Sequence, residues 1–374
     1  MVAKSNNPAG LRGLIAGKTA LSTVGNDGSG LTYRGYDVKS LAALCEFEEI
    51  AYLLLKGDLP NVSELKEYKE KLRSLRPLPK ALKDILEKIP ATAHPMDVLR
   101  TGVSALGSLE TEWDVAEQTK KADRLLASLP AICCYWYRYS HEGVKIETET
   151  SADSIGGHLL EMLTGEKAKP LHEQAMHVSL ILYAEHEFNA STFTARICAS
   201  TLSDFHSCIT GAIGTLRGAL HGGANEAAMD MIASWTSPDA AEKALMLMLS
   251  RNEKIMGFGH AVYRTSDPRN AVIKAWSQRL SREVGDTRLY AVSERCEQVM
   301  WREKELFCNT DFYHASAYHF MGIPTKLFTP LFVMSRLAGW SAHVFEQRAN
   351  NRIIRPSAEY VGEGSRTVLP IAQR

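Results

Sequence analysis

The sequence lacks the features of membrane, secreted and nucleic-acid-binding proteins. No uninterrupted apolar run reaches the length of about 20 residues that spans a bilayer, and residues Met1 to Pro8 lack the apolar core of a signal peptide. Lys plus Arg and Asp plus Glu both number 43, so the chain has no overall field that would attract nucleic acid or an anionic membrane. We therefore expect a cytoplasmic protein with no nucleic-acid or membrane partner, in which any anion site is local.

Motifs for disulfides, metals and nucleotides are missing as well. The 7 cysteines are an odd number and none are spaced as C-x-x-C, which argues against a disulfide framework and a zinc ribbon. His172 and His177 are one residue too far apart for the H-E-x-x-H zinc motif, and Gly257-Phe258-Gly259 lacks the third glycine of a dinucleotide fingerprint. We expect buried free thiols, no metal site and no permanently bound cofactor.

Helical spacing of apolar residues is what the sequence has in abundance. Leu65, Tyr68, Leu72 and Leu75 follow one helical face up to Pro77. Short β-like runs occur near the start, in residues 19–36, on either side of a turn cluster at residues 26–30. The sequence thus predicts an all-α fold with a small N-terminal β-hairpin. Helices are expected at about 63–76, 82–89, 94–108, 120–140, 153–164, 171–186, 190–203, 205–217, 224–234, 238–250, 269–283, 286–305, 311–321 and 327–349.

One segment, residues 257–269, indicates chemistry more than packing. Gly257 and Gly259 let the backbone approach a ligand closely, and His260 exchanges a proton near neutral pH. The guanidinium groups of Arg264 and Arg269 are suited to carboxylates or phosphates. A plainer interpretation is a glycine turn with solvated charges, and the segment by itself supports both.

Two further segments decide between these interpretations. Residues 218–226 place His221 beside two glycines, and residues 309–314 place Asp311 before an aromatic-rich helical run. Together the three segments, which include LHGGAN, GFGHAVYRTSDPR and NTD in this order, resemble the citrate synthase family. The resemblance covers most of the chain, from Tyr33 to Ser357.

The resemblance implies how the chain is divided and assembled. Family members have a large helical domain built from both ends of the chain and a smaller inserted helical domain. Here the large domain would comprise residues 1–221 and 325–374, and the small one residues 222–324. Hinge-like backbone is then expected near His221, Gly322 and Pro324. The resemblance also implies a homodimer in which Arg355 reaches the active site of the neighbouring subunit.

The resemblance further implies a role for individual residues. Asp311 would be the base that removes the α-proton of an acyl-CoA, His221 would donate a hydrogen bond to the enol(ate), and His260 would polarise or protonate the keto oxygen of oxaloacetate. The residues implied to bind oxaloacetate are His186, Arg269, Arg336 and Arg355. The acyl-CoA, as a co-substrate, is implied to bind to Lys254, Ile255, Met256, Gly257, Phe258, Arg264 and Arg352.

Plainer alternatives stay open for several of these residues. Arg336 lies in a run apolar enough for a core helix, and a buried guanidinium needs either a carboxylate of the protein or a bound anion. His186 could be a structural histidine at a helix end, and Arg352 a surface charge in a polar run. Arg355 alone suggests only a solvated C-terminal segment.

The choice of acyl-CoA rests on a finer resemblance. Residues 94–104, 135–137, 154–158 and 353–358 look most similar to 2-methylcitrate synthases, the members that use propionyl-CoA. One methylene is worth only about 1–3 kcal/mol in a pocket, so some activity with acetyl-CoA is expected, and a citrate synthase is the alternative. A non-catalytic helical binding protein would not need His221, His260 and Asp311 together, and a metal-dependent hydrolase should lose activity with a chelator.

Overall fold

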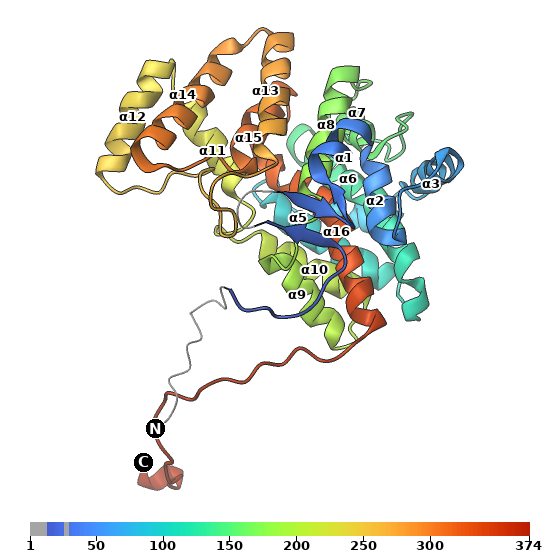
Figure 1. Ribbon diagram of the computed structural model, residues 1–374. Helices are drawn as coiled ribbons and strands as arrows, with labels where there is room; N and C mark the ends of the chain where they lie inside the picture. The colour runs from blue at the N-terminus through green and yellow to red at the C-terminus, as the bar shows by residue number, and fades with distance from the viewer. Residues whose placement is uncertain (1–12, 26–29) are drawn as a thin grey trace.

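The computed structural model describes residues 13–25 and 30–374. Within these residues the chain forms sixteen α-helices and one small sheet (Figure 1). The helices are α1 (Val38–Leu44), α2 (Phe47–Lys56), α3 (Val62–Ser74), α4 (Lys80–Leu86), α5 (Pro95–Leu109), α6 (Gln118–Glu142), α7 (Ile155–Thr164), α8 (Pro170–Tyr183), α9 (Ala190–Ser200), α10 (Phe205–Leu216), α11 (Ala224–Ala233), α12 (Pro238–Ser250), α13 (Asn270–Val284), α14 (Thr287–Lys304), α15 (Thr310–Phe320) and α16 (Phe328–Ala349). Short 3₁₀ turns lie at Val115–Glu117, Thr325–Leu327 and Ile371–Gln373. The predicted all-α fold is confirmed, and the expected helices agree with those observed to within a few residues.

The small sheet is antiparallel and contains β1 (Ser22–Val24), β2 (Leu31–Tyr33) and β3 (Tyr36–Asp37), in this order. Thr23 is paired with Thr32 in β1 and β2, the two strands of the expected hairpin. Its predicted turn at residues 26–30 lies, except for Gly30, outside the described residues. Strand β3 was not expected, because two residues carry no readable alternation of polar and apolar side chains.

Side-chain caps fix the helix starts that position the site. Asn189 accepts a hydrogen bond from the backbone N–H of Thr192 at 3.2 Å and caps α9. Asn309 accepts from the backbone N–H of Asp311 at 3.1 Å and caps α15. Each cap satisfies a donor that the first turn of a helix leaves free. Asp311 is thereby held in the first turn of α15.

Two groups of helices are visible in the molecule. Helix α16 is buried along most of its length and packs against α2, α5, α6, α8, α9 and α10. Helices α11 to α15 pack mainly on one another and lie together on one side, where they are coloured yellow to orange in Figure 1. They fall within residues 222–324, and the division of the chain into domains at these positions stays a prediction.

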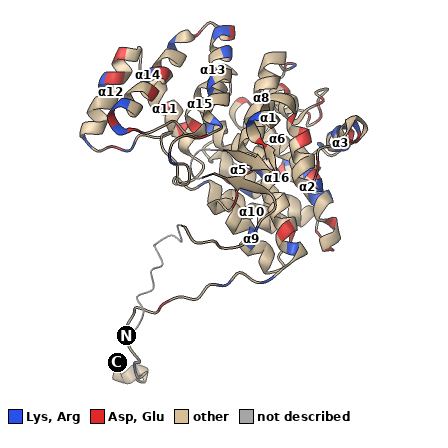
Figure 2. Cartoon of the chain, in the orientation of Figure 1, with Lys and Arg blue, Asp and Glu red and all other residues tan. Residues whose placement is uncertain are grey.

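Charged residues of both signs lie side by side on α12 and α14 (Figure 2). Arg295 pairs with Asp239 at 2.9 Å and with Glu242 at 2.8 Å, and Arg302 also pairs with Glu242. Such pairs at the surface add little stability, but each places opposite charges next to each other on these two helices. No helix in the described part of the chain is both long and apolar enough to cross a bilayer.

The C-terminal residues leave the helical body after α16. Residues 350–374 run away from it as an extended segment with one short turn near the end (Figure 1). Tyr360, Val361, Val368 and Ile371 are between 78% and 87% exposed. The described residues therefore provide little cover for the apolar side chains of this segment.

Candidate active site

Two loops that are distant in the sequence pair with each other and build the floor of the site. The backbone N–H of Gly259 donates to the carbonyl of Phe307 at 2.8 Å, and that of Asn309 donates to the carbonyl of Gly257 at 3.0 Å. The side-chain amide of Asn309 donates to the carbonyl of Gly259 at 3.1 Å. Gly257 and Gly259 have φ angles of +87° and +71°, which glycine adopts readily. This pairing brings the backbone before His260 next to the backbone that leads into Asp311.

Asp267 connects the same two loops and was not among the predicted site residues. Its carboxylate accepts from Nε and Nη2 of Arg269 at 2.9 and 2.8 Å, and from the backbone N–H of Thr310 at 3.1 Å. The bidentate pair keeps Arg269 charged, because Asp267 raises the pKa of this buried guanidinium. Arg269 thus lies in the site with two donor groups engaged. The sequence signal for this pairing is the D-P-R spacing.

His260 has one ring nitrogen fixed as an acceptor. The backbone N–H groups of Val262 and Tyr263 donate to its Nδ1 at 3.0 and 3.2 Å. Burial, followed by the charge of Arg269, lowers the pKa of His260 to about 4. The ring is therefore neutral at pH 7 and carries its proton on Nε2.

His221 lies in the turn that follows α10 and has the opposite tautomer. Its Nε2 is 3.3 Å from the backbone N and 2.8 Å from Oγ of Ser191, at the start of α9. A backbone N–H donates only to an unprotonated ring nitrogen, so the proton of the neutral ring belongs on Nδ1. Burial, followed by the charge of Arg336, lowers the pKa of His221 to about 4. The imidazole is thus a neutral hydrogen-bond donor at pH 7.

Asp311 accepts a short hydrogen bond at Oδ1 from the phenol of Tyr183, the last residue of α8. Burial raises the pKa of Asp311 to about 6, although the hydrogen bond from Tyr183 and the charge of Arg269 act in the opposite direction. A carboxylate with a pKa near the working pH is suited to take up a proton and to release it again.

Arg336 lies on α16 with only 2% of its surface exposed. Its Nε donates to the carbonyl of Tyr183 at 2.6 Å, and no carboxylate of the described residues forms an ion pair with it. Burial lowers the pKa of Arg336 to about 10, so the group is still charged at pH 7. Of the two alternatives for this residue, the internal salt bridge is not found, and a bound anion would supply the missing partner.

His186, just beyond the end of α8, is buried next to His260. Its Nε2 lies 3.1 Å from the phenol oxygen of Tyr263, and the two imidazole centroids are 5.1 Å apart. Burial and the charge of Arg269 lower the pKa of His186, so this ring is neutral as well. The structure thus brings together six predicted site residues, which are His186, His221, His260, Arg269, Asp311 and Arg336.

Of the predicted CoA residues, Lys254 to Phe258 occupy the loop before His260, and Arg264 follows it. Lys254 is exposed, Ile255 is buried, and the Phe258 ring packs on that of Phe312 with centroids 4.6 Å apart. Arg264 is exposed and lines a hollow of about 610 Å³ together with Thr265, Trp301, Arg302 and Glu305. The guanidinium groups of Arg264 and Arg302 could bind an anion in this hollow. The role of the predicted residues in binding CoA stays a prediction.

Arg352 and Arg355 are not brought to the site within this chain. Both are exposed beyond the end of α16, where the backbone N–H of Ile354 donates to Oγ of Ser200 at 3.0 Å. Ser200 ends α9, whereas Ser191, the partner of His221, lies at its start. Nine residues of helix separate them by about 13 Å. Among the described residues, no hydrogen bond or ion pair joins either arginine to the residues of the site.

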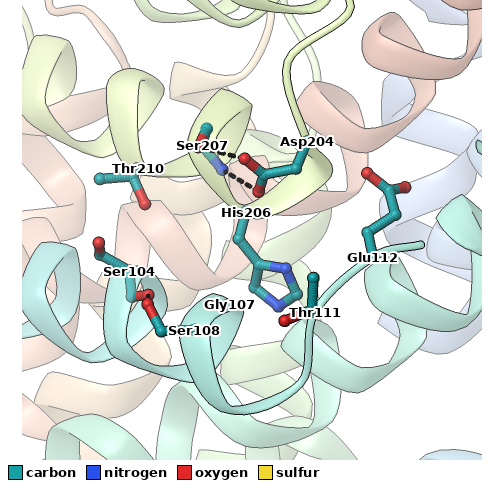
Figure 3. A pocket seen from close by; sticks show the side chains of 9 residues that line it. All are labelled: Ser104, Gly107, Ser108, Thr111, Glu112, Asp204, His206, Ser207 and Thr210. Atoms are coloured by element: carbon teal, nitrogen blue, oxygen red, sulfur yellow. Dashed lines mark hydrogen bonds between the residues drawn. The ribbon is translucent and has the colours of Figure 1, made fainter. Parts of the chain in front are cut away.

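A separate polar hollow of about 430 Å³ lies between α5 and α10 (Figure 3). The nine residues that line it include none of the predicted site residues. His206 is buried there, the described residues offer neither of its ring nitrogens a hydrogen-bond partner, and burial lowers its pKa. Glu112 is engaged by Arg348 at 2.9 Å and by the backbone N–H of Phe205 at 2.7 Å. The hollow thus lacks the paired proton-transfer groups of the candidate site.

The described residues contain one group with the donors of a metal site, which is Glu46, Glu48 and His177 at the start of α2. All three are already engaged, and Oε1 of Glu48 accepts from the backbone N–H of Ile155 at 2.5 Å. Glu46 pairs with Lys69 at 2.7 Å, and Nδ1 of His177 accepts from the backbone N–H of Phe47 at 3.1 Å. This group does not belong to the candidate active site.

A comparison with known protein families gives a match over nearly the whole chain, including all the residues of the site described above. The family model described as "Citrate synthase, C-terminal domain" matches residues 10–357. The chain belongs to the citrate synthase family. The resemblance inferred from its three segments is thereby confirmed.

Individual relatives of this citrate synthase family member agree with the assignment. The chain is 66% identical over 372 residues to a 2-methylcitrate synthase of Shewanella oneidensis, covering 100% of this chain and 99% of the relative. It is 42% identical to citrate synthase 2 of Bacillus subtilis, with 98% of each chain covered. Among solved structures it is similar to the citrate synthase of Thermoplasma acidophilum in a ternary complex with carboxymethyl coenzyme A and oxaloacetate. That match has a TM-score of 0.90 and 33% identity, and it covers 98% of both chains.

Besides Asp267, three further residues of this family member's site were missed in the sequence. Tyr183 contacts Asp311, Ser191 contacts His221, and Tyr263 contacts His186. Tyr263 lies within the GFGHAVYR segment and Ser191 within EHEFNAS, so proximity to predicted residues was an available signal. Tyr183 lies three residues before His186, so the same signal was available for it, although its contact with Asp311 was not readable from its apolar helical neighbours.

Proposed function

We propose that this chain is a 2-methylcitrate synthase, which condenses propionyl-CoA with oxaloacetate and water to give 2-methylcitrate and CoA. The observation that carries the proposal is the identity of 66% over the full length to a 2-methylcitrate synthase. The proposed site is in accord with this reaction. It combines a carboxyl with a raised pKa, three neutral imidazoles, and a buried guanidinium that forms no ion pair with the described residues.

In the first step Asp311 removes a proton from the α-carbon of the acyl-CoA. Negative charge then develops on the thioester oxygen, and Nδ1–H of His221 donates a hydrogen bond to it. A neutral donor in a buried site is well suited to an enol(ate) oxygen, because it stabilises the developing charge without giving the enzyme a permanent ion. The pKa of Asp311, about 6, lies close to the working pH that such a base requires.

In the second step the nucleophilic α-carbon attacks the keto carbon of oxaloacetate and forms the new carbon–carbon bond. The keto oxygen becomes negative, and Nε2–H of His260 donates to it or transfers its proton. Water then hydrolyses the thioester of the condensed product, which releases CoA as the thiol. This hydrolysis makes the overall reaction favourable.

The two carboxylates of oxaloacetate are assigned to Arg336, to the free donors of Arg269, and to Arg355 of a neighbouring subunit. His186 contributes a further hydrogen bond. For acyl-CoA, we assign the loop of residues 254–258 to the adenine and Arg264 to the phosphates, with Arg352 as a second phosphate contact. These assignments follow the family resemblance.

We extend the proposal to a homodimer in the cytoplasm. The exposed apolar side chains of residues 360–371 favour a partner chain, because isolated tails rarely present so many to water. All 7 cysteines are free thiols, which is typical of a reducing compartment.

The substrate is tested by measuring release of free thiol from propionyl-CoA and acetyl-CoA with oxaloacetate. Burial of one more methylene is worth about 0.8 kcal/mol, so kcat/KM should be at least about fourfold higher for propionyl-CoA, with acetyl-CoA still a substrate. A clear preference for acetyl-CoA, with citrate as the product by mass, would make the chain a citrate synthase instead.

Two controls separate the remaining classes of protein. Activity that persists with EDTA argues against a metal-dependent hydrolase. Thiol release that requires oxaloacetate distinguishes condensation from simple thioester hydrolysis. Absence of thiol release with either acyl-CoA would favour a non-catalytic binding protein.

A further inference from the structure

Three hydrogen bonds connect α8, together with His186 just after its end, to the segment of residues 222–324. Oγ of Ser179 lies 2.6 Å from the phenol of Tyr318, the phenol of Tyr183 donates to Asp311, and His186 contacts the phenol of Tyr263. Positions 179, 183 and 186 are separated by four and three residues, which places the first two on one helix face and continues its line into the following turn. The middle contact of this line is made to the proposed base.

The side chain of Tyr183 has little freedom to move. It is 1% exposed, and its ring lies between those of His314 and Phe332, each with a centroid distance of 4.2 Å. Burial, followed by the negative charge of Asp311, raises the pKa of Tyr183 well above its usual value. The phenol therefore stays protonated and remains a donor at neutral pH.

The hydrogen bond from Tyr183 makes the two oxygens of the Asp311 carboxylate different from each other. Oδ1 accepts from Tyr183, whereas the described residues offer Oδ2 no hydrogen-bond partner. Since a carboxylate rotates easily about its terminal bond, one strong hydrogen bond is enough to define which oxygen faces the reactant. The unengaged oxygen is the one free to accept a proton.

Tyr183 also contacts the residue assigned to oxaloacetate. Its carbonyl accepts from Nε of Arg336 at 2.6 Å, which leaves the terminal nitrogens of this guanidinium to a ligand. One residue at the end of α8 thus orients a group for each substrate, through its side chain for one and its backbone for the other.

We propose that Tyr183 is a positioning residue, which holds Oδ1 of Asp311 so that Oδ2 takes the α-proton of the acyl-CoA. The inference rests on the proposed function, because it assigns a task to the base of that reaction. A tyrosine that served packing alone would fill the same space between His314 and Phe332, but its hydroxyl would be dispensable.

The test is Tyr183→Phe, with Tyr318→Phe as the matched control. Both tyrosines are buried, both lie against His314, and each loses a single hydroxyl contact, to Asp311 in one case and to Ser179 in the other. Tyr183→Phe should lower kcat by about tenfold with little change in KM, because a hydrogen bond to a charged group is lost. The acidic limb of the pH profile should move to higher pH, since the lost contact is one that lowers the pKa of Asp311. Tyr318→Phe should leave this limb in place.

A readout without turnover keeps the inference separate from the choice of reaction. Carboxyl ¹³C NMR of the wild type, with the Asp311 signal identified by its loss in Asp311→Asn, follows the titration of Asp311 directly. Tyr183→Phe should raise its midpoint, whether or not the protein condenses propionyl-CoA. Failure of thiol release in the wild type overturns the proposed function alone. An Asp311 midpoint that is unchanged in Tyr183→Phe, or that shifts equally in Tyr318→Phe, overturns the role of Tyr183.

Discussion

At the scale of single residues, burial has opposite consequences for acids and bases in the site. It raises the pKa of Asp311 to about 6 and lowers those of His221 and His260 to about 4, because a low-dielectric surrounding disfavours every charged form. The same cause therefore produces one carboxylate that exchanges protons near neutral pH and two uncharged imidazoles that donate hydrogen bonds. Their tautomers are opposite, since different backbone amides face their rings.

Asp311→Asn should reduce turnover by at least about 10²-fold while oxaloacetate still binds, because the amide keeps the shape of the side chain but cannot accept the proton. In the wild type, the base works only when it is ionised. With a pKa of about 6, kcat/KM should fall as the pH drops through this value. Steady-state kinetics from pH 5 to 8 and calorimetric titration with oxaloacetate measure both effects. Near-normal turnover of Asp311→Asn would remove Asp311 from the role of base.

At the scale of elements, the sequence predicted most helices because they are long and their apolar spacing is regular. Helices α1 and α2 were not expected. The first is as short as α4, and the helical spacing of its buried residues Val38, Leu41 and Ala42 is a signal that could have located it. The second has a capping box at Glu46 and Glu49 and ends at Gly57, which are signals that could have located it.

The site could be predicted only where its residues lie in recognisable segments. His221, His260 and Asp311 stand in three such segments, and the structure places them together. Tyr183 lies 128 residues before Asp311, so their contact depends on how α8 packs against α15. A relation of this kind is created by tertiary structure and leaves no local pattern in the sequence. The proposed tasks of all these residues stay predictions until variants are measured.

The pairing of the loops at residues 257–259 and 307–309 predicts an effect of Gly257→Ala. A Cβ at position 257 would lie 2.8 Å from Cδ2 of Phe312, on a backbone with φ of +87°. The loop must then shift, and a displacement of about 1 Å near reacting groups costs up to about 10²-fold in rate. We expect kcat/KM to fall by at least about tenfold.

Gly285→Ala is the matched control for this variant. Its φ of +73° imposes similar backbone strain, but a Cβ there would meet no atom of the described residues within 4 Å. It should lower the free energy of unfolding by about 1 kcal/mol without loss of activity. Equal kinetic losses in the two variants would mean that strain, and not displacement of the loop, causes the effect.

At the scale of the whole molecule, the extended C-terminal segment separates two candidate ligand arginines from the site. Arg355 follows Ile354, whose backbone contacts the end of α9. From there the extended segment runs away from the helical body. The residues after it expose apolar side chains, as a segment that packs on another chain would. In the proposed dimer, therefore, each active site combines Asp311 of one chain with Arg355 of the other.

Mixing two inactive variants tests this arrangement. Arg355→Ala homodimers lack the arginine in both sites, and Asp311→Asn homodimers lack the base in both. A heterodimer contains one site with neither substitution and one with both, since Arg355 acts across the interface. Equal mixing gives half heterodimers, so activity should recover to about a quarter of the wild type. The measurement is thiol release before and after subunit exchange, with exchange followed by native mass spectrometry. If Arg355 acted on its own chain's site, every site in the mixture would carry one defect, and confirmed exchange without recovery would show this. If Arg355 acted on no site, Arg355→Ala homodimers would already be active before mixing.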